Sequence, residues 1–449
     1  MKFKKYPKYK DSGIEWIGEI PEDWEKIPLR YVLEQGKTGI KIGPFGSALK
    51  LDSMVESGYK VYGQENVIKS NFDLGLRFID ETKFTEMIGY ELLEGDVIVT
   101  MMGTTGLSKV VPKNAKKGIM DSHLVRIRVN KEICDNNFLS FLINSGNYLK
   151  IQMKLASKGS IMEGLNSSIL KSILLFLPKE VEEQKQIREF LQKQIGKIDS
   201  DIEKNQKLIE LLKEKRQSTI NQAVTKGLDP TVPMKDSGIE WIGEIPEHWK
   251  IERVKFHTKI NHKTLDENTE PESMIHYIDI SSVNSNGNIS SPEQMNFNDA
   301  PSRARRILTE GDCIVSTVRT YLRAIAYISS VTNKLICSTG FAVLSPNSNL
   351  DSKFLFYQIR NEGFIENIMA NSVGVTYPAI NSSLLGTFPV IIVPKIEQKQ
   401  IAEFLDKETT KIDSLITKTE SQIEKLEEFR QSLITSAVTG KIDVRGIAA

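Results

Sequence analysis

The feature that most constrains this 449-residue chain is a run of twelve residues that occurs twice without a change. The letters DSGIEWIGEIPE occupy residues 11–22 and return at residues 236–247. An identical run of this length, with a Trp and a Pro in it, is not expected by chance and indicates an internal repeat. A chain that repeats its sequence is expected to repeat its structure, so the extent of the repeat predicts the architecture.

The correspondence continues in the same order to the end of the chain. EGDVIVT at 94–100 corresponds to EGDCIVS at 310–316, and EQKQIREFL at 183–191 corresponds to EQKQIAEFL at 397–405. The opening segment and the last third of the two copies are similar, whereas the segments between them agree only at scattered positions. We therefore predict two tandem copies of one frame that present two different binding surfaces. Within the opening segment we expect an apolar tether formed by Trp16, Ile17, Ile20 and Trp24.

The last part of each copy predicts a long helix, because the residues after Pro178 and Pro394 are rich in Glu, Lys, Gln, Leu and Ile. Each run of about 40 residues would form a helix on the order of 60 Å long. Apolar residues recur at alternating steps of three and four with one shared extra step of four, as in a coiled-coil seam with a stutter. The seam positions are Ile187, Leu191, Ile198, Ile202, Ile209, Leu212 and Ala223 in the first copy and Ile401, Leu405, Ile412, Ile416, Ile423, Leu426 and Ala437 in the second.

A helix of this length cannot be buried by its own domain alone. We therefore expect the two helices to pack against each other, and the polar seam residues Asn205 and Thr419 to fix their register. The alternative is that each helix only caps its own globular half.

The segments between the frame regions predict mixed α/β modules. Residues 123–130 alternate apolar and basic side chains with the period of a half-buried strand. GDVIVT and GDCIVS have the pattern of short buried strands entered by a turn. We expect the loops between these strands to form the working surface.

The charge of the chain points to local rather than global binding surfaces, since 59 basic side chains face 58 acidic ones. Residues 101–120 contain lysines and no acidic residue, and residues 301–323 are rich in arginine. Cationic groups beside hydroxyl residues suit phosphate contact and base-edge readout, although a solvated basic face is the alternative. The side-chain amides with the donor and acceptor pair that can read adenine, which could equally cap turns, are Gln64, Asn66, Asn284 and Asn286.

No motif for catalysis or metal binding is complete. YVLEQGKT at 31–38 ends like a phosphate-binding loop, but Tyr31 stands where its first glycine is required. Two Glu-x-Lys fragments, at 183–185 and 397–399, resemble part of a nuclease site but lie at the start of the predicted helices. The histidines form no convincing set of metal ligands. We therefore expect no catalytic centre, no metal site and no cofactor in this chain.

The termini and cysteines bear on location. The basic N-terminus is followed by polar sequence where a signal peptide needs an apolar core, and no window approaches a membrane-spanning length. The 3 cysteines have no partner at metal-ligand spacing, and an odd number argues against a disulfide framework. We expect a cytoplasmic protein with reduced thiols and no membrane partner.

Several phrases stand in a characteristic order: GPFGS (43–47), GQENV (63–67), EGDVIVT (94–100), CSTGFAVL (337–344), YPAINSSLL (377–385) and the EQKQI helix starts (183–187 and 397–401). Through these phrases, whose order covers nearly all of the chain, the sequence resembles the specificity subunit of type I restriction–modification systems. One departure is DSHLVRI at 121–127, which replaces the STGF phrase in the first copy.

The resemblance implies an α+β fold class, in which two globular α/β target-recognition domains are separated by two long antiparallel coiled-coil helices with an internal pseudo-two-fold repeat. The expected ranges are 1–180 for the first recognition domain, 181–225 for the first spacer helix, 226–394 for the second domain and 395–440 for the second helix. Each domain would read one half of a split double-stranded DNA sequence, and the helices would act as a ruler. The implied partners are two methyltransferase subunits, which bind S-adenosylmethionine, and motor-nuclease subunits.

The candidate DNA-binding residues lie mainly in the loops of the two modules. They are Lys41, Ser47, Lys50, Gln64, Asn66, Lys69, Thr104, Thr105 and Lys109 in the first copy, and Asn284, Asn286, Arg303, Arg305, Arg306, Thr317, Arg319, Tyr321, Arg323 and Tyr377 in the second.

The sequence leaves two alternatives to a specificity subunit open. A divergent stand-alone DNA methyltransferase or nuclease would be active by itself. A coiled-coil adaptor whose variable modules bind proteins would not give a complex that retains specific DNA.

Overall fold

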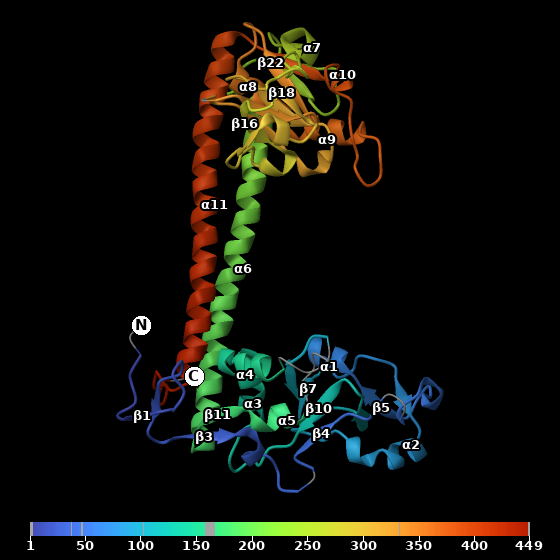
Figure 1. The fold of residues 1–449 in the computed structure, drawn as a ribbon, viewed down its shortest axis with the longest axis vertical. Coiled ribbons are helices and arrows are strands. Elements are labelled where there is room, and N and C mark those ends of the chain that lie inside the picture. The colour runs from blue at the N-terminus through green and yellow to red at the C-terminus, as the bar shows by residue number, and fades with distance from the viewer. Residues whose placement is uncertain are drawn as a thin grey trace. The chain divides into compact units, whose positions relative to one another are not determined.

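The computed structural model describes residues 3–36, 38–45, 48–101, 103–157, 167–331 and 333–447 of the chain. The chain divides into two compact units: unit 1 consists of Met1–Lys204 and Gln422–Ala449, and unit 2 consists of Asn205–Ser421. Two long helices, α6 (Val181–Lys226) and α11 (Lys395–Val438), each contribute one part to unit 1 and the other part to unit 2 (Figure 1). Unit 1 is therefore built from both ends of the sequence.

The described part of unit 1 contains two main sheets. The antiparallel sheet has the strand order β4 (Ile40–Ile42), β10 (Leu124–Ile127), β7 (Val97–Thr100), β8 (Ser108–Val110). The mixed sheet has the order β6 (Phe78–Ile79), β5 (Tyr59–Tyr62), β9 (Gly118–Met120). Two antiparallel pairs join β1 (Tyr9–Asp11) to β2 (Glu19–Pro21) and β3 (Trp24–Pro28) to β11 (Leu174–Pro178). The short helices are α1 (Gln64–Ile68), α2 (Glu81–Glu86), α3 (Asn136–Ser145), α4 (Asn147–Ser157) and α5 (Ser167–Ser172).

Unit 2 has sheets of the same kinds. The antiparallel sheet has the order β15 (Thr258–Ile260), β22 (Phe341–Pro346), β19 (Cys313–Ser316), β20 (Ile325–Tyr327). The mixed sheet has the order β17 (Glu293–Asn296), β16 (Met274–Ile278), β21 (Leu335–Ser338), β18 (Ala304–Ile307). The antiparallel pairs are β12 (Met234–Asp236) with β13 (Glu244–Pro246) and β14 (Lys250–Arg253) with β23 (Pro389–Ile392). The short helices are α7 (Val254–His257), α8 (Ser352–Ile359), α9 (Glu362–Ala370) and α10 (Ser382–Leu385).

The internal repeat predicted from the sequence is confirmed at the level of topology. β5 and β9 are parallel in unit 1, as β16 and β21 are in unit 2. β10 lies between β4 and β7 as β22 lies between β15 and β19, so the departing phrase at 121–127 leaves the strand order unchanged. Unit 2 adds β18 at the edge of its mixed sheet, beside β21.

The duplicated opening segment is a tether to the long helices. Trp24 and Trp249 are buried, and their indole N–H groups donate to Glu183 Oε1 at 3.0 Å and to Glu397 Oε2 at 2.9 Å. The two glutamates of the Glu-x-Lys fragments therefore anchor tryptophans in the first turn of each helix. Trp16, which was expected to join the tether, is instead 53% exposed.

The glutamine that follows this glutamate in each EQKQI phrase also makes the same contact in both units. Gln184 Oε1 accepts from the backbone N–H of Asp135 at 2.9 Å, and Gln398 Oε1 accepts from that of Asp351 at 2.6 Å. Asp135 and Asp351 are the N-caps of α3 and α8. The shared letters of the two helix starts are therefore explained by contacts that hold the frame.

Each unit contains an antiparallel pair of helix segments. In unit 1, Leu191 near the start of α6 belongs to the same buried core as Ala437 near the end of α11. In unit 2, Ala223 near the end of α6 belongs to the same buried core as Leu405 near the start of α11. The expectation that the two helices pack against each other, rather than each capping its own half, is confirmed within both units.

Ion pairs across the helices define their register. In unit 2, Arg216 Nε lies 2.9 Å from Asp413 Oδ1, and the arginine side chain is 9% exposed. In unit 1, Arg430 Nε lies 2.9 Å from Asp199 Oδ1. These contacts join α6 to α11 directly.

Of the two polar seam residues, Thr419 contributes less to the register than expected. Thr419 is buried, but its hydroxyl donates to the carbonyl of Leu415 on its own helix at 2.8 Å. Asn205 is half-buried on α6. The Thr419 hydroxyl therefore does not link the two helices, and the role expected of Asn205 stays a prediction.

Among the described residues, no helix is both long enough and apolar enough to cross a membrane.

Candidate nucleic-acid interface

The carboxyl ends of the parallel strands form the same kind of edge in both units. In unit 1, Tyr62 and Met120 are paired residues at the ends of β5 and β9. In unit 2, Ile278 and Cys337 are the corresponding pair on β16 and β21. Loops that leave neighbouring parallel strands at their carboxyl ends meet at one edge of a sheet, where ligands often bind. We take this edge in each unit as a candidate site.

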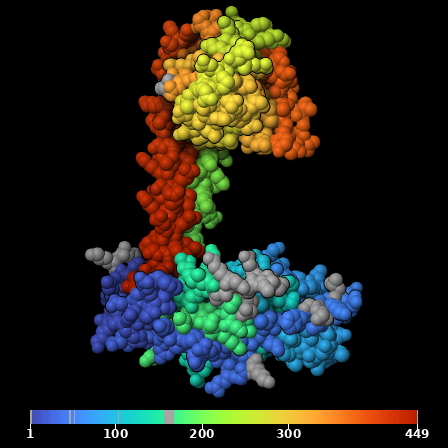
Figure 2. Space-filling view, in the orientation of Figure 1, coloured from blue at the N-terminus to red at the C-terminus, as the bar shows by residue number. Residues whose placement is uncertain are grey.

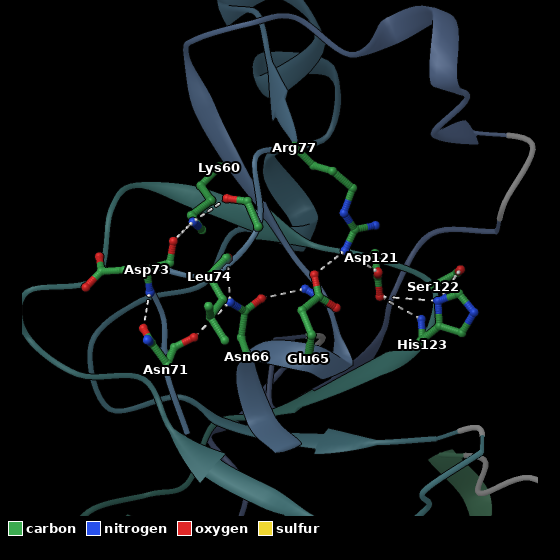
Figure 3. A network of polar contacts seen from close by, with 12 residues as sticks. Lys60, Glu65, Asn66, Asn71, Asp73, Leu74, Arg77, Asp121, Ser122 and His123 are labelled. Carbon is green, nitrogen blue, oxygen red and sulfur yellow. Dashed lines mark hydrogen bonds and ion pairs between the residues drawn. The ribbon is translucent and has the colours of Figure 1, made fainter. Parts of the chain in front are cut away.

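In unit 1 the edge holds an ion cluster around Arg77 (Figure 3). Arg77 Nη2 lies 3.0 Å from Glu65 Oε1 and 3.0 Å from Asp121 Oδ2. Asp121 directly follows β9 and accepts a hydrogen bond from the backbone N–H of His123 at 2.9 Å. Burial by itself lowers the pKa of Arg77, but Asp121 and then Glu65 outweigh burial and raise it. The guanidinium is therefore charged and held by two carboxylates.

Gly63 provides the space that this cluster occupies. A Cβ atom at position 63 would lie 2.2 Å from Arg77 Nη2 and 2.3 Å from Glu65 Oε2. The φ angle of Gly63 is −123°, which other residues also adopt. A larger residue at this position would therefore displace the side chains of the cluster, although the backbone conformation itself would accept it.

Asn66 and Lys60 hold the chain that carries Arg77 (Figure 3). Asn66 is fully buried; its Oδ1 accepts from the N–H of Gly63 at 2.9 Å and its Nδ2 donates to the carbonyl of Leu74 at 2.9 Å. Lys60 Nζ donates to the carbonyls of Asp73 at 3.0 Å and Gly75 at 3.1 Å. The structure corrects the expectation for Asn66, because its amide is used inside the protein and presents no free edge to a base.

The other predicted residues of unit 1 are spread over several elements, with Lys41 on β4, Gln64 on α1, Lys109 on β8 and the rest of those described in loops. Lys50, Lys69, Thr104 and Thr105 are exposed, whereas Gln64 and Lys109 are half-buried. Lys41 is half-buried with its Nζ 4.8 Å from the centre of the Tyr90 ring. Gln64 directly precedes Glu65 of the Arg77 cluster in the sequence. Its Oε1 is buried and has no hydrogen-bond partner among the described residues. Ser47 lies outside the described residues.

In unit 2 the equivalent edge holds Arg303, Asp279 and Tyr277. Arg303 Nη2 donates to Asp279 Oδ2 at 2.8 Å, and Arg303 Nε donates to the Tyr277 hydroxyl at 3.1 Å. The Tyr277 hydroxyl donates in turn to Asp279 Oδ2 at 3.1 Å. Burial by itself raises the pKa of Asp279, but the hydrogen bond from Arg303 and further contacts outweigh burial and lower it.

A second group in unit 2 lies at the turn between β19 and β20. The guanidinium of Arg319 lies 4.7 Å from the centre of the Tyr377 ring, and its backbone N–H donates to the carbonyl of Pro378 at 2.8 Å. Tyr377 belongs to the loop between α9 and α10, which projects from the body of unit 2 (Figure 1). Tyr321, in the same turn, is 49% exposed. Arg319 and Tyr377 therefore form an exposed cation–aromatic pair, and Tyr321 is a further exposed aromatic side chain of the same turn.

Two predicted residues near this turn are engaged in structural contacts. Arg323 donates through Nη1 to Glu362 Oε2 at 2.8 Å and through Nη2 to Glu362 Oε1 at 2.5 Å, which ties the turn to α9. Thr317 is 8% exposed, and its hydroxyl donates to the carbonyl of Gly340 at 2.9 Å. We therefore correct the expectation for both residues, because their polar groups are used within the unit.

The remaining predicted residues of unit 2 lie on β18 and in the turn after β16. Arg305 stacks on Phe297 with 4.9 Å between its guanidinium and the ring centre, and Arg306 donates to Thr264 Oγ1 at 3.2 Å. Asn284 Oδ1 accepts a hydrogen bond from the backbone N–H of Asn286 at 3.0 Å, so the side chain of Asn284 stabilises the turn. The side chain of Asn286 is exposed. In Figure 2 the segment that contains β16 and β17 (yellow) forms much of the visible face of unit 2.

The sequence reasoning missed Glu65, Arg77 and Asp121 in unit 1 and Asp279 and Tyr277 in unit 2. Arg77 and Asp121 are separated by 44 positions in the sequence, and neither lies in a motif of known spacing. One available signal was the phrase that departs from the second copy, because Asp121 is its first residue. Among the described residues, no group of three or more His, Cys, Asp or Glu side chains could hold a metal ion.

Comparison with known proteins agrees with this architecture. A family model described as type I restriction modification DNA specificity domain matches residues 21–213 and 246–425. The type I restriction enzyme MjaVIII specificity subunit of Methanocaldococcus jannaschii is 24% identical over 100% of this chain and 99% of its own length.

Two solved structures are similar in fold. The HsdS subunit from Thermoanaerobacter tengcongensis is 15% identical, covers 94% of this chain and 98% of its own, and has a TM-score of 0.56. A chain from a structural study of complex assembly and conformational transition in the type I restriction–modification system is 16% identical, covers 94% of this chain and 99% of its own, and has a TM-score of 0.68. The α+β fold class expected from the sequence is thereby confirmed.

Proposed function

The chain belongs to the family of type I restriction–modification DNA specificity domains, and from this premise we propose how its two units divide the task of recognition. As a specificity subunit, the protein binds DNA sequence-specifically. Unit 1 reads one half of a bipartite double-stranded target and unit 2 reads the other half. Helices α6 and α11 set the spacing between the half-sites and dock methyltransferase subunits.

The observation that carries this proposal is a repeated frame with different side chains at equivalent edges. In both units an arginine and a carboxylate meet at the carboxyl ends of two parallel strands. Arg77 is held by two carboxylates, whereas Arg303 is held by one carboxylate and one phenol. Equivalent edges that offer different donors and acceptors are suited to reading two different DNA sequences.

The proposed DNA surface contains exposed or half-buried residues of both units that keep a free polar or cationic group. It comprises Lys41, Lys50, Gln64, Lys69, Thr104, Thr105 and Lys109 in unit 1, and Asn286, Arg303, Arg305, Arg306, Arg319, Tyr321 and Tyr377 in unit 2.

The chemistry is assigned to other subunits. We propose that this chain is not itself an enzyme and that it assembles with two methyltransferase subunits, which bind S-adenosylmethionine, and with motor-nuclease subunits. Because the ligand would be chromosomal DNA, the proposal includes a cytoplasmic location.

The test is to map methylated bases genome-wide in a host that expresses the methyltransferase subunits with or without this chain. The expected result is a bipartite methylated sequence that appears only with the chain. An exchange of one unit's variable segment should then change one half-site and preserve the other. Methylation by the chain alone would support a stand-alone methyltransferase. A complex that does not retain specific DNA would support a protein adaptor.

A further inference from the structure

We propose that Arg303 reads a guanine in the half-site recognised by unit 2, and that Asp279 and Tyr277 position its guanidinium for this contact. The inference rests on the proposed function, because it names the base contact made at the unit 2 edge.

The hydrogen bonds of Arg303 leave one bidentate edge of its guanidinium free. An arginine can form a fork through its side edge, Nε with Nη2, or through its end edge, Nη1 with Nη2. The side edge of Arg303 is occupied by the Tyr277 hydroxyl at 3.1 Å and Asp279 Oδ2 at 2.8 Å. Among the described residues, none forms a hydrogen bond with Nη1. The end edge therefore matches N7 and O6 of guanine, the most common specific contact of arginine in the major groove.

The environment of Arg303 favours a base edge over a phosphate. Its side chain is 59% exposed, so the end edge is accessible. Asp279 lies 2.8 Å away and offsets the charge of the guanidinium, so a phosphate at this point would also be repelled by the carboxylate. A neutral base edge meets no such repulsion. Holding the side edge also reduces the rotamer freedom that is lost when the contact forms.

Two other arginines show why this geometry is specific to Arg303. The end edge of Arg323 is occupied by both oxygens of Glu362, so it has no free fork at that edge. Both bidentate edges of an arginine include Nη2, which has two N–H groups. Arg77 Nη2 donates to two carboxylates, Glu65 and Asp121, whereas Arg303 Nη2 donates to one and keeps its second N–H for a fork. The unit 1 edge therefore cannot present the same fork, and the two units offer different readers.

The arginine of each edge comes from a different part of the frame. Arg77 directly precedes β6, which pairs with β5, whereas Arg303 directly precedes β18, which pairs with β21. β5 corresponds to β16 and β9 corresponds to β21, so the two arginines reach equivalent edges from opposite sides of the parallel pair. Duplication of the frame alone does not account for an arginine at both edges.

The experiment uses the full chain assembled with its methyltransferase subunits and DNA duplexes that contain the mapped target. Each guanine of the half-site assigned to unit 2 by segment exchange is replaced in turn by 7-deazaguanine, which lacks the N7 acceptor. At one position the wild-type complex should lose affinity, whereas the Arg303→Ala complex should show no further loss there. Preference for guanine at that position should fall about 5- to 150-fold in Arg303→Ala, the range for one bidentate contact.

Three controls separate base reading from a structural role. Hypoxanthine at the same position keeps N7 and O6 and should be tolerated by the wild-type complex. Arg323→Ala removes a guanidinium whose end edge is occupied and should retain the 7-deazaguanine penalty. Asp279→Asn should lower the guanine preference without changing the salt dependence of binding, because it alters position and not a phosphate contact.

Several results would overturn the inference while leaving the proposed function intact. One is a unit 2 half-site without guanine on either strand. Another is an Arg303→Ala complex that keeps the 7-deazaguanine penalty, or that loses thermal stability with unchanged base preference. Failure of the proposed function would look different, because the wild-type chain would then direct no bipartite methylation.

Discussion

The polar residues of this protein fall into two groups: some make hydrogen bonds that hold the frame together, and others are exposed on the surface. Glu183 binds the indole N–H of Trp24 at 3.0 Å and the hydroxyl of Tyr6 at 2.7 Å. Asn66 and Lys60 are fully engaged with backbone groups around the Arg77 cluster. By contrast, Arg319 and Tyr377 contact each other and remain exposed. A polar residue in a loop is therefore informative about DNA only after its internal partners are known.

The tether makes a direct prediction about stability. Trp24→Ala should destabilise unit 1 by about 3 to 5 kcal/mol, because it removes a fully buried aromatic side chain and leaves a cavity. Trp16→Ala is the matched control, since Trp16 is 53% exposed and should change stability little. Thermal melting of the two variants checks this. A wild-type melting temperature in Trp24→Ala, together with an altered DNA preference, would contradict the structural role.

The C-terminal residues of unit 1 make a prediction about pH. Arg445 Nη2 donates to Asp443 Oδ2 at 2.7 Å, and the backbone N–H of Asp443 donates to the carbonyl of Lys4 at 2.8 Å. Burial raises the pKa of Asp443, but the hydrogen bonds from Arg445 outweigh burial and lower it below the ordinary value of 3.8. A carboxylate with a lowered folded pKa contributes stability above its unfolded pKa and loses that contribution as the pH falls through the folded pKa.

The stability difference between wild type and Asp443→Asn should therefore be constant from about pH 7 to pH 5 and should shrink below about pH 4. Urea denaturation across this range is the measurement. A difference that grows as the pH falls would contradict the assigned direction of the pKa change.

Among the elements, α6 and α11 depend on side chains that cross from one helix to the other. Periodicity identifies the apolar seam, but it does not reveal that Arg216 is buried against Asp413. The ion pair between Arg430 and Asp199 is more exposed than the pair between Arg216 and Asp413, since its side chains are 39% and 52% accessible. Buried and exposed ion pairs differ in energy because an unpaired buried charge retains its desolvation cost.

Asp413→Ala should therefore destabilise unit 2 by about 1.5 to 3 kcal/mol, the range for hydrogen bonds to charged groups. Asp199→Ala, which breaks the exposed pair, should cost less than about 1 kcal/mol. Replacement of both partners by Arg216→Met with Asp413→Ala should recover part of the loss, since no unpaired charge remains. Guanidinium denaturation of the variants is the measurement, and equal losses in the two single variants would contradict the difference in burial.

At the scale of the whole molecule, both long helices belong to both compact units. α6 leaves unit 1 and ends in unit 2, whereas α11 leaves unit 2 and ends in unit 1. The residues after α11 pair with the N-terminal segment, as in the bridge between Lys4 and Asp443. The core of unit 1 therefore forms only when the two ends of the chain come together.

If the helices set the spacing of the half-sites, matched seven-residue insertions near Ile209 and Ile423 should lengthen the spacer. A seven-residue step keeps the apolar seam facing the partner helix and adds roughly 10 Å at about 1.5 Å per residue. This corresponds to about three base pairs at ~3.4 Å each. Methylation mapping should show unchanged half-sites with more unspecified base pairs between them. An insertion in α6 alone is the control and should impair assembly, because the seam loses its register.

Two outcomes would contradict this prediction. An unchanged spacer with full activity would exclude the helices as a ruler. Changed half-site letters would exclude the separation between the frame and the recognition surfaces.

Local sequence patterns determined the repeat, the two long helices and the mixed helix and strand content of the modules. Trp24 and Trp249, the seam around Leu191 and Leu405, and the short buried strands all follow from apolar spacing, which acts over a few residues and is visible in any single sequence. The tertiary structure decided which distant side chains meet. Arg77 with Asp121, and Arg303 with Asp279, depend on strand register and on loops that bring together residues far apart in the chain. It also buried Asn66 and paired Arg323 with Glu362, because burial and ion pairing depend on which residues packing brings into contact.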